Sequence, residues 1–98
     1  MAVIDELRVE DNPAEHRYEA RAGGRLLGFV SYRAGPDRIT LIHTEVEPEV
    51  EHRGVGSQLV AATLDDVRAR RLTVVPVCPF VRAFIRRHPE YAGLVGAR

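Results

Sequence analysis

The chain has 98 residues, of which 45% are hydrophobic and 29% are charged, and its formal net charge is zero. This size and composition predict one small globular domain spanning residues 1–98, with a core too small for a second lobe. The neutral charge balance argues against a nucleic-acid partner or an anionic membrane surface.

Cysteine usage and hydropathy indicate where the protein works. Cys78 is the only cysteine, which excludes an internal disulfide and is typical of a reducing compartment. The first residues lack a basic region followed by an apolar run, and no segment approaches the roughly 20 apolar residues of a membrane span. The four histidines show no metal-ligand spacing with one another or with the cysteine. We therefore expect a cytoplasmic protein with no metal site.

The first half of the chain is typical of four antiparallel strands in a meander. These strands are expected at about residues 3–9, 16–21, 25–33 and 38–46. Gly23-Gly24 suits a two-residue hairpin, whose turn positions need positive φ angles. Strict alternation in the fourth strand would place two sets of side chains on opposite faces. One set is Ile39, Leu41, His43 and Glu45, and the other is Thr40, Ile42, Thr44 and Val46.

In the second half the hydrophobic period changes to that of a helix with one buried stripe. The stripe consists of Leu59, Val60, Thr63, Leu64 and Val67. Residues 72–77 form a short buried strand, which should lie parallel to the strand that ends at Val46, after a right-handed crossover. Pro79 can begin a last helix that runs to about His88, and Pro89 ends it.

The junction before the first helix carries the strongest functional signal. Gly54 and Gly56 stand where several backbone N–H groups lack intrahelical partners and where the helix dipole favours an anion. Glycine also lets an anion approach the backbone without a Cβ in the way. A dinucleotide-binding loop would need a third glycine, and a Walker-type loop would need a lysine, which the chain lacks. The turn therefore predicts a phosphate site of another kind.

This order of elements, with the loop Arg53-Gly54-Val55-Gly56 before the helix, resembles the Gcn5-related N-acetyltransferases. Their signature is Gln/Arg-x-x-Gly-x-Gly/Ala, and Glu51 departs from its first position. Four segments resemble the small single-domain branch of that family more closely: residues 43–46, 53–56, 75–81 and 87–91. The resemblance covers about residues 28–94. It implies an α/β fold with a mixed sheet, in which antiparallel strands lead to a central strand and the last strand splays from it.

The resemblance also implies acetyl-CoA as the cofactor, bound where the two strands splay apart. Backbone groups of Thr44, Glu45 and Val46 would pair with the pantetheine arm as another strand would. The pyrophosphate would contact the residues at the start of the helix: Arg53, Gly54, Val55, Gly56 and Ser57. The side chains of Arg53 and Ser57 could add donors, although a merely solvated Arg53 is an equal interpretation.

Acetyl transfer to an amine needs a base, because an alkylamine has a pKa of about 10.4 and is protonated at neutral pH. Glu45 is the first candidate, and His43 could act with it or have no role. Cys78 could be the nucleophile of an acetyl-enzyme or the acid that protonates the CoA thiolate, but a free cysteine often merely packs in the core. Tyr91 could also donate a proton, although a core position explains it better.

Three hypotheses follow. The leading one is an acetyl-CoA-dependent N-acetyltransferase that acts on an unidentified amine, by direct attack or through Cys78. The second is a catalytically silent acyl-CoA-binding module. The third is a small nucleic-acid or protein-interaction domain that uses Arg82, Arg86, Arg87 and His88, and the zero net charge weighs against it. The resemblance implies an open acceptor side that suits a protein or peptide amine, and an exposed strand edge that allows a monomer or a homodimer. The sequence identifies neither the acceptor nor the length of the acyl group.

Overall fold

The computed structural model describes residues 6–96, so the predicted strand position Val3 lies outside the described residues. One five-stranded sheet has the order β1-β2-β3-β4-β5. Its strands are β1 (Arg8–Asn12), β2 (Arg17–Ala22), β3 (Arg25–Ala34), β4 (Arg38–Val46) and β5 (Thr73–Pro76). The first four are antiparallel neighbours, and β5 is parallel to β4. The predicted mixed α/β sheet is confirmed.

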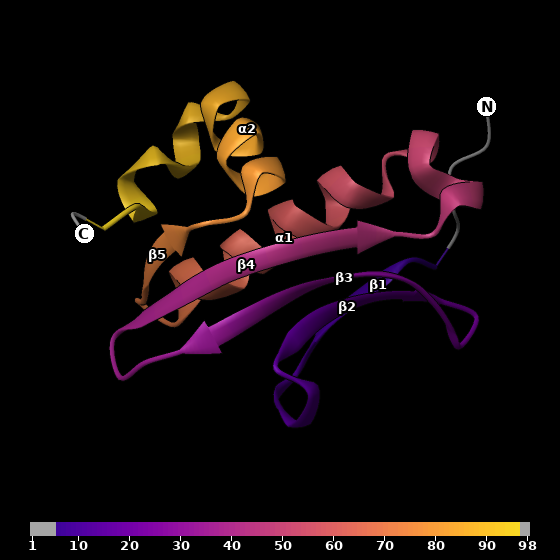
Figure 1. Ribbon diagram of the computed structural model, residues 1–98, viewed down its shortest axis with the longest axis horizontal. Coiled ribbons are helices and arrows are strands. Elements are labelled where there is room, and N and C mark those ends of the chain that lie inside the picture. Colours follow the sequence, from indigo (N-terminus) through magenta and orange to yellow (C-terminus); the bar gives the residue numbers. More distant parts are fainter. Residues whose placement is uncertain (1–5, 97–98) are drawn as a thin grey trace.

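Two α-helices and three 3-10 helices complete the described chain. They are η1 (Pro13–Glu15), η2 (Pro48–Arg53), α1 (Val55–Ala69), α2 (Pro79–Arg87) and η3 (Pro89–Leu94). Figure 1 shows α1 running along the sheet, with α2 and η3 gathered at the end where β5 lies. The sequence analysis did not predict η2 and η3. Each begins at a proline, whose fixed φ is already suited to the first helical position.

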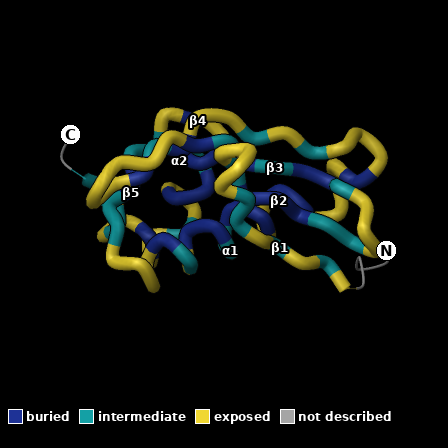
Figure 2. Tube along the Cα trace, turned by 90° about the horizontal axis from the view of Figure 1, so that it is seen from below, coloured by how far each residue is buried: buried dark blue, intermediate teal, exposed yellow. Residues whose placement is uncertain are grey.

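The predicted stripe of α1 is its buried face. Leu59, Val60, Thr63, Leu64 and Val67 are each fully buried. The hydroxyl of Thr63 donates to the carbonyl of Leu59 at 2.8 Å, so this polar group is satisfied inside the core. Figure 2 shows the buried segments in the middle strands and helices, and the exposed segments at the turns. Apolar burial against α1 therefore holds one face of the sheet.

A bulge in β4 breaks the alternation that the sequence predicts. Ile39 and Leu41 are buried, as expected for the core face. The register with β3 then shifts and leaves Ile42 without a pairing partner of its own. One extra residue in a strand moves every later side chain to the opposite face. The expectation that His43 and Glu45 share a face with Ile39 and Leu41 is therefore wrong.

The parallel strands β4 and β5 separate after a short pairing. Leu41 opposite Pro76 is the last pair in their register. The N–H groups of Val77 and Cys78 both donate to the carbonyl of Leu41, at 3.0 and 2.9 Å, and end the ladder. From here the chain turns into α2 while β4 continues to Val46. Beyond Leu41, β4 still pairs with β3 but has no strand on the side of β5 among the described residues, which is the expected splay.

Candidate functional site

A pocket of about 360 Å³ opens between the splayed part of β4 and the start of α1. It is lined by Thr44, Val46, Glu51, His52, Gly54, Gly56, Ser57 and Phe80. Residues from four elements thus meet at one place, although they are far apart in the sequence. The pocket brings together most of the residues predicted to bind the cofactor.

The start of α1 has the geometry of an anion site. Gly54 adopts φ +81° as the residue before the helix, and no side chain caps the helix start. The N–H of Gln58 donates to the carbonyl of Gly54 at 3.0 Å. Val55, Gly56 and Ser57 come before Gln58, so their N–H groups belong to the first turn of α1 and have no acceptor within the helix. The helix dipole adds partial positive charge at the same place.

Gly56 also lets two helices meet at the pocket. A Cβ at this position would lie 2.9 Å from Cζ of Phe80. Phe80 is 39% exposed, at the start of α2, so its ring forms one wall of the pocket. The sequence pattern places position 80 in the last helix and in the segment 75–81 that carries the resemblance, but it indicates no ligand contact for Phe80. Its place directly after Pro79, at a helix start beside the splay, was the available signal.

The 3-10 helix η2 brings two unpredicted side chains to the pocket and leaves one predicted side chain outside it. Glu51 and His52 line the pocket, whereas Arg53 is exposed and is not part of the lining. Val55 is fully buried and does not line the pocket, so Gly54, Gly56 and Ser57 are the predicted residues of the turn that border it. No arginine lies among the lining residues. The pocket therefore offers backbone N–H groups to an anion rather than a guanidinium.

Cys78 lies on the same side of β4 as this pocket. Its side chain is 3% exposed, and its Sγ lies 3.3 Å from Oγ1 of Thr44. Cys78 is also the residue that precedes α2, where β4 and β5 have just separated. The thiol is therefore a buried group at the inner end of the splay.

His43 and Glu45 lie on the opposite face of β4. Nε2 of His43 is 3.0 Å from Oε2 of Glu45, and both side chains are more than half exposed. Neither lines the pocket at the start of α1. The structure thus pairs these two predicted residues with each other and separates them from the glycine turn by the strand itself.

Further side chains lie next to His43 and Glu45 on the face of the sheet that α1 does not cover, here called the open face. The sequence pattern did not indicate them. The guanidinium of Arg17 lies 4.8 Å from the ring centre of Phe29, and the ring of His43 meets Phe29 edge-on at 6.4 Å. Glu19 holds Arg17 through a 2.7 Å ion pair and is itself only 5% exposed. Alternation places Glu19 on the face of β2 opposite the buried Tyr18 and Ala20, where the neighbouring arginines cover it.

The charge of Glu19 is stabilised by its neighbours. Burial would raise the pKa of its carboxyl group, but hydrogen bonds from Arg17, Asn12 and Arg21 outweigh burial and lower that pKa below its ordinary value. Glu19 is therefore a buried carboxylate held in the ionised form on a face that no helix covers among the described residues.

Other candidate residues have structural partners. The hydroxyl of Tyr91 donates to Asp65 at 2.9 Å, and burial together with this bond raises the pKa of Tyr91. Arg82 donates to the carbonyl of Val77 at 2.8 Å, at the end of β5. His88 stacks on Phe84 with ring centres 4.2 Å apart. These contacts favour a core role for Tyr91 and a structural role for part of the arginine face of α2.

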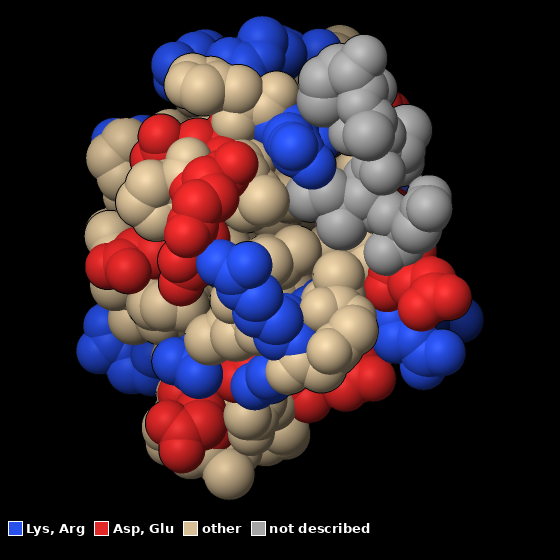
Figure 3. Space-filling model, turned by 90° about the vertical axis from the view of Figure 1, so that its right-hand side faces the viewer, with Lys and Arg blue, Asp and Glu red and all other residues tan. Residues whose placement is uncertain are grey.

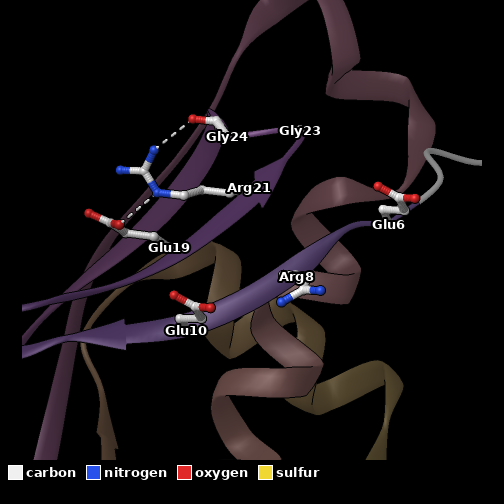
Figure 4. Close-up of a pocket in the computed structure, with 7 residues that line it drawn as sticks. All are labelled: Glu6, Arg8, Glu10, Glu19, Arg21, Gly23 and Gly24. Atoms are coloured by element: carbon white, nitrogen blue, oxygen red, sulfur yellow. Dashed lines mark hydrogen bonds and ion pairs between the residues drawn. The ribbon is translucent and has the colours of Figure 1, made fainter.

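A further pocket, of about 310 Å³, lies over β1 and the β2–β3 turn (Figure 4). It is lined by Glu6, Arg8, Glu10, Glu19, Arg21, Gly23 and Gly24. Arg21 is already held by Glu19 at 3.1 Å and by the carbonyl of Gly24 at 3.2 Å. Three carboxylates accompany the two arginines, so this pocket offers an anion no net positive charge.

Two classes of site find no support in the part of the chain that the structure describes. No group of three or more histidine, cysteine, aspartate or glutamate side chains within residues 6–96 could hold a metal ion. Within the same range, no helix is both long and apolar enough to cross a bilayer.

Comparison with known proteins now adds to this geometry. Residues 17–94 match the family model described as GCN5-related N-acetyl-transferase. None of the curated proteins matches the chain. The chain is similar to the solution structure of a GCN5-like protein from Staphylococcus aureus, with a TM-score of 0.71 and 21% identity over 96% of this chain and 92% of that one.

Two longer proteins share the same fold. One is a ribosomal-protein-alanine N-acetyltransferase from Brucella melitensis biovar Abortus, with a TM-score of 0.58 and 21% identity over 84% of this chain and 62% of that one. The other is Ard1 from Thermoplasma volcanium, with a TM-score of 0.57 and 22% identity over 80% of this chain and 55% of that one. At these identities the likeness concerns the fold alone.

Proposed function

The chain belongs to the GCN5-related N-acetyl-transferase family of acetyl-transferring enzymes, and we propose that it transfers acetyl from acetyl-CoA to an amine. One domain spanning residues 1–98 would carry this activity. The observation that supports the proposal most directly is the uncapped, glycine-containing start of α1, which faces the splayed edge of β4. A backbone cradle beside a free strand edge suits a ligand with a pyrophosphate and an extended amide arm.

The residues fit such a ligand in two parts. Backbone N–H groups from Val55 to Ser57 would hold the pyrophosphate, together with the exposed hydroxyl of Ser57. Backbone groups of Thr44 and Val46 would pair with the pantetheine arm, because this stretch of β4 has no strand beside it on the side of β5. Arg53 would act only from the rim.

The chemical step would take place where the splay gives access to both faces of β4. Glu45 would accept the proton of the acceptor ammonium, and His43 would orient Glu45 through their 3.0 Å contact. The amine nitrogen would form a bond to the acetyl carbon while the C–S bond breaks, and the departing thiolate would take up the proton that the nitrogen loses as it becomes an amide. This route satisfies the need for a neutral amine without a covalent intermediate on the protein.

Cys78 distinguishes direct attack from a two-step route. Its thiol is 3% exposed and contacts Thr44, which favours packing or a proton-donating role over nucleophilic attack. We therefore expect intact-mass spectra after incubation with acetyl-CoA to show no added acetyl group. A mass increase of one acetyl group that is lost in Cys78→Ala would replace the direct route with the two-step route.

Thermal unfolding with and without acetyl-CoA tests the cofactor site. At 100 times its Kd a ligand stabilises by about 2.7 kcal/mol. For a domain of this size that corresponds to a rise of about 10–20 °C in the midpoint. Ser57→Glu should remove most of this rise, because a carboxylate would face the phosphates, while a negative charge at a helix start favours the fold.

Gln58→Glu is the matched control. Gln58 is exposed and does not line the pocket. The variant adds the same charge as Ser57→Glu one residue later, and it should keep most of the rise in unfolding midpoint that acetyl-CoA causes. A folded wild-type protein that shows no rise at millimolar acetyl-CoA would contradict the proposal. A rise without transfer to any amine would favour the silent acyl-CoA-binding module.

A further inference from the structure

A small groove lies at the end of β4, beside Phe29 and Glu45 on the open face of the sheet. Its volume is about 110 Å³. It is lined by Leu26, Leu27, Gly28, Phe29, Glu45, Val46, Glu47 and Pro48. The N–H of Glu47 donates to the carbonyl of Leu27 at 2.8 Å and ties β3 to the chain after β4. Gly28 allows this close approach, because a Cβ there would lie 2.7 Å from the carbonyl oxygen of Glu45.

One wall of the groove is held in place before any ligand arrives. The ring of Phe29 lies between the guanidinium of Arg17, at 4.8 Å, and the edge of His43, at 6.4 Å. Arg17 is fixed in turn by the buried carboxylate of Glu19, which also accepts a hydrogen bond from Asn12 at 3.0 Å. A preformed apolar wall costs a ligand less ordering entropy than a mobile one.

The charges at the groove have one prevailing sign. Glu45 and Glu47 both border it. Arg25 lies 3.8 Å from Glu47 and 3.1 Å from Glu49, so one guanidinium serves two carboxylates. Figure 3, which shows the end of the molecule with η2, has acidic and basic side chains interspersed over the wider surface. Two carboxylates border the groove and the nearby Arg25 is shared with Glu49, which favours a single cationic group held between Glu45 and Glu47.

We propose that this groove binds the acceptor of the transferase reaction, as a primary ammonium on an unbranched alkyl arm. The arm would lie along Phe29 and Leu26, and the ammonium would lie between Glu45 and Glu47. A volume of about 110 Å³ holds about four water-sized groups, which admits an alkyl chain but not an aromatic ring beside it. This assignment rests on the proposed function, because it places the acceptor next to the proposed base.

The alkylammonium can be tested without the cofactor. n-Butylamine is titrated into the isotope-labelled protein, and amide NMR shifts are followed, with 1-butanol as a neutral ligand of the same shape. Butylammonium should shift the amides of the groove, and butanol should shift them far less. Equal shifts from both ligands, or shifts confined to other parts of the protein, would overturn the proposal.

Two matched variants locate the charge that matters. Glu47→Gln removes a carboxylate from the groove, and Glu49→Gln removes one that shares Arg25 but lies outside the lining. Glu47→Gln should weaken butylammonium binding by about two- to fivefold, which is the range of an exposed ion pair, and Glu49→Gln by much less. Both side chains are exposed, so both variants should fold. Equal effects of the two variants would contradict the assignment.

The two possible sources of the alkylammonium are separated by a second titration. A lysine blocked at both ends and a free diamine offer the same arm, and the tighter binder identifies the source. Because no cofactor is present, the outcome is independent of the proposed function. If the protein binds butylammonium in the groove but does not bind acetyl-CoA, the groove is an amine site and the proposed transferase function is contradicted. If the protein acetylates only amines that do not shift the groove amides, the transferase function is supported and the groove is not the acceptor site.

Discussion

The two faces of the sheet are built from different chemistry. The face beneath α1 is held by fully buried apolar side chains such as Val30, Leu41 and Leu64. The open face carries ion pairs and polar side chains instead, with Glu19 and Arg17 at their centre. β4 has side chains on both faces, as every strand does, and its bulge at Ile42 decides which of the later residues reach each face.

This difference separates two tasks within five residues of β4. Thr44 and Val46 face the helices, beside the buried thiol of Cys78 and the start of α1. His43 and Glu45 face the open side, where water and a second substrate can reach them. A strand with regular alternation from Leu41 would have placed the carboxylate of Glu45 in the core. Under the proposed function, the bulge lets one strand offer an edge to the cofactor and an exposed carboxylate as the base.

Glu45→Gln gives the largest expected effect and tests this division directly. The amide cannot accept the proton, so the rate of CoA release with a saturating amine should fall by about 100- to 10,000-fold. The rise in unfolding midpoint caused by acetyl-CoA should not change, because the variant lies on the other face. Both quantities are measured on the same protein, with Glu49→Gln as a control for the loss of one nearby charge. An unchanged rate of CoA release would show that Glu45 is not the base. Loss of the rise in unfolding midpoint with acetyl-CoA would show that the two faces do not have separate roles.

Much of this arrangement could be predicted from local patterns. The stripe from Leu59 to Val67 predicted α1 and its buried face, because helical periodicity persists over several turns. Gly23 and Gly24 both adopt positive φ, as their hairpin position required. The short strand followed by Pro79 correctly indicated a parallel β5 and a last helix.

The remaining features depend on contacts between distant residues. Alternation in β4 failed at Ile42 because a bulge depends on how two strands pair, which one strand's residues do not specify. The burial of Glu19 depends partly on Asn12 of the neighbouring strand β1, which adds a hydrogen bond to those from Arg17 and Arg21 of its own strand. Phe80 lines the cleft because Gly56 leaves room for its ring, a relation across 24 positions of sequence.

Glu19→Gln sharpens the comparison by weakening only the open face. Its loss leaves Arg17 and Arg21 without a charged partner, and we expect a loss of about 2 kcal/mol in the free energy of unfolding at neutral pH. The folded-state pKa of Glu19 lies below its ordinary 4.5. Its stabilising contribution is therefore present above pH 4.5 and is lost as the pH falls through the folded-state pKa. Urea unfolding at a series of pH values should show the gap between variant and wild type closing in acid.

The control for this series is Glu10→Gln. Glu10 is an exposed carboxylate directly opposite Glu19 in the β1–β2 register. It should change the free energy of unfolding by less than about 0.5 kcal/mol at any pH. A gap for Glu19→Gln that stays constant into acid would show that packing, rather than charge, holds this part of the open face.

Tyr32→Phe should have the smallest effect of the three variants. It tests how the face beneath α1 responds to alkaline pH. The hydroxyl of Tyr32 donates to Asp11 at 2.6 Å, and Asp11 also pairs with Arg70 of the segment after α1 at 2.8 Å. Burial, followed by the bond and charge of Asp11, raises the pKa of Tyr32 from 10.0 to about 12. Its contribution is therefore complete below pH 10.0 and is lost as the pH rises toward about 12.

Removing this hydroxyl should cost about 1 kcal/mol at neutral pH, because Asp11 keeps Arg70 as a partner. Urea unfolding of both proteins between pH 8 and about 11.5 should show the gap narrowing above pH 10.0. Tyr18, whose hydroxyl bonds to Asp66, is present in both proteins, so its own titration cancels in the difference. A gap that stays constant up to about pH 11.5 would show that the Tyr32 hydroxyl makes no contribution to stability that depends on its own protonation.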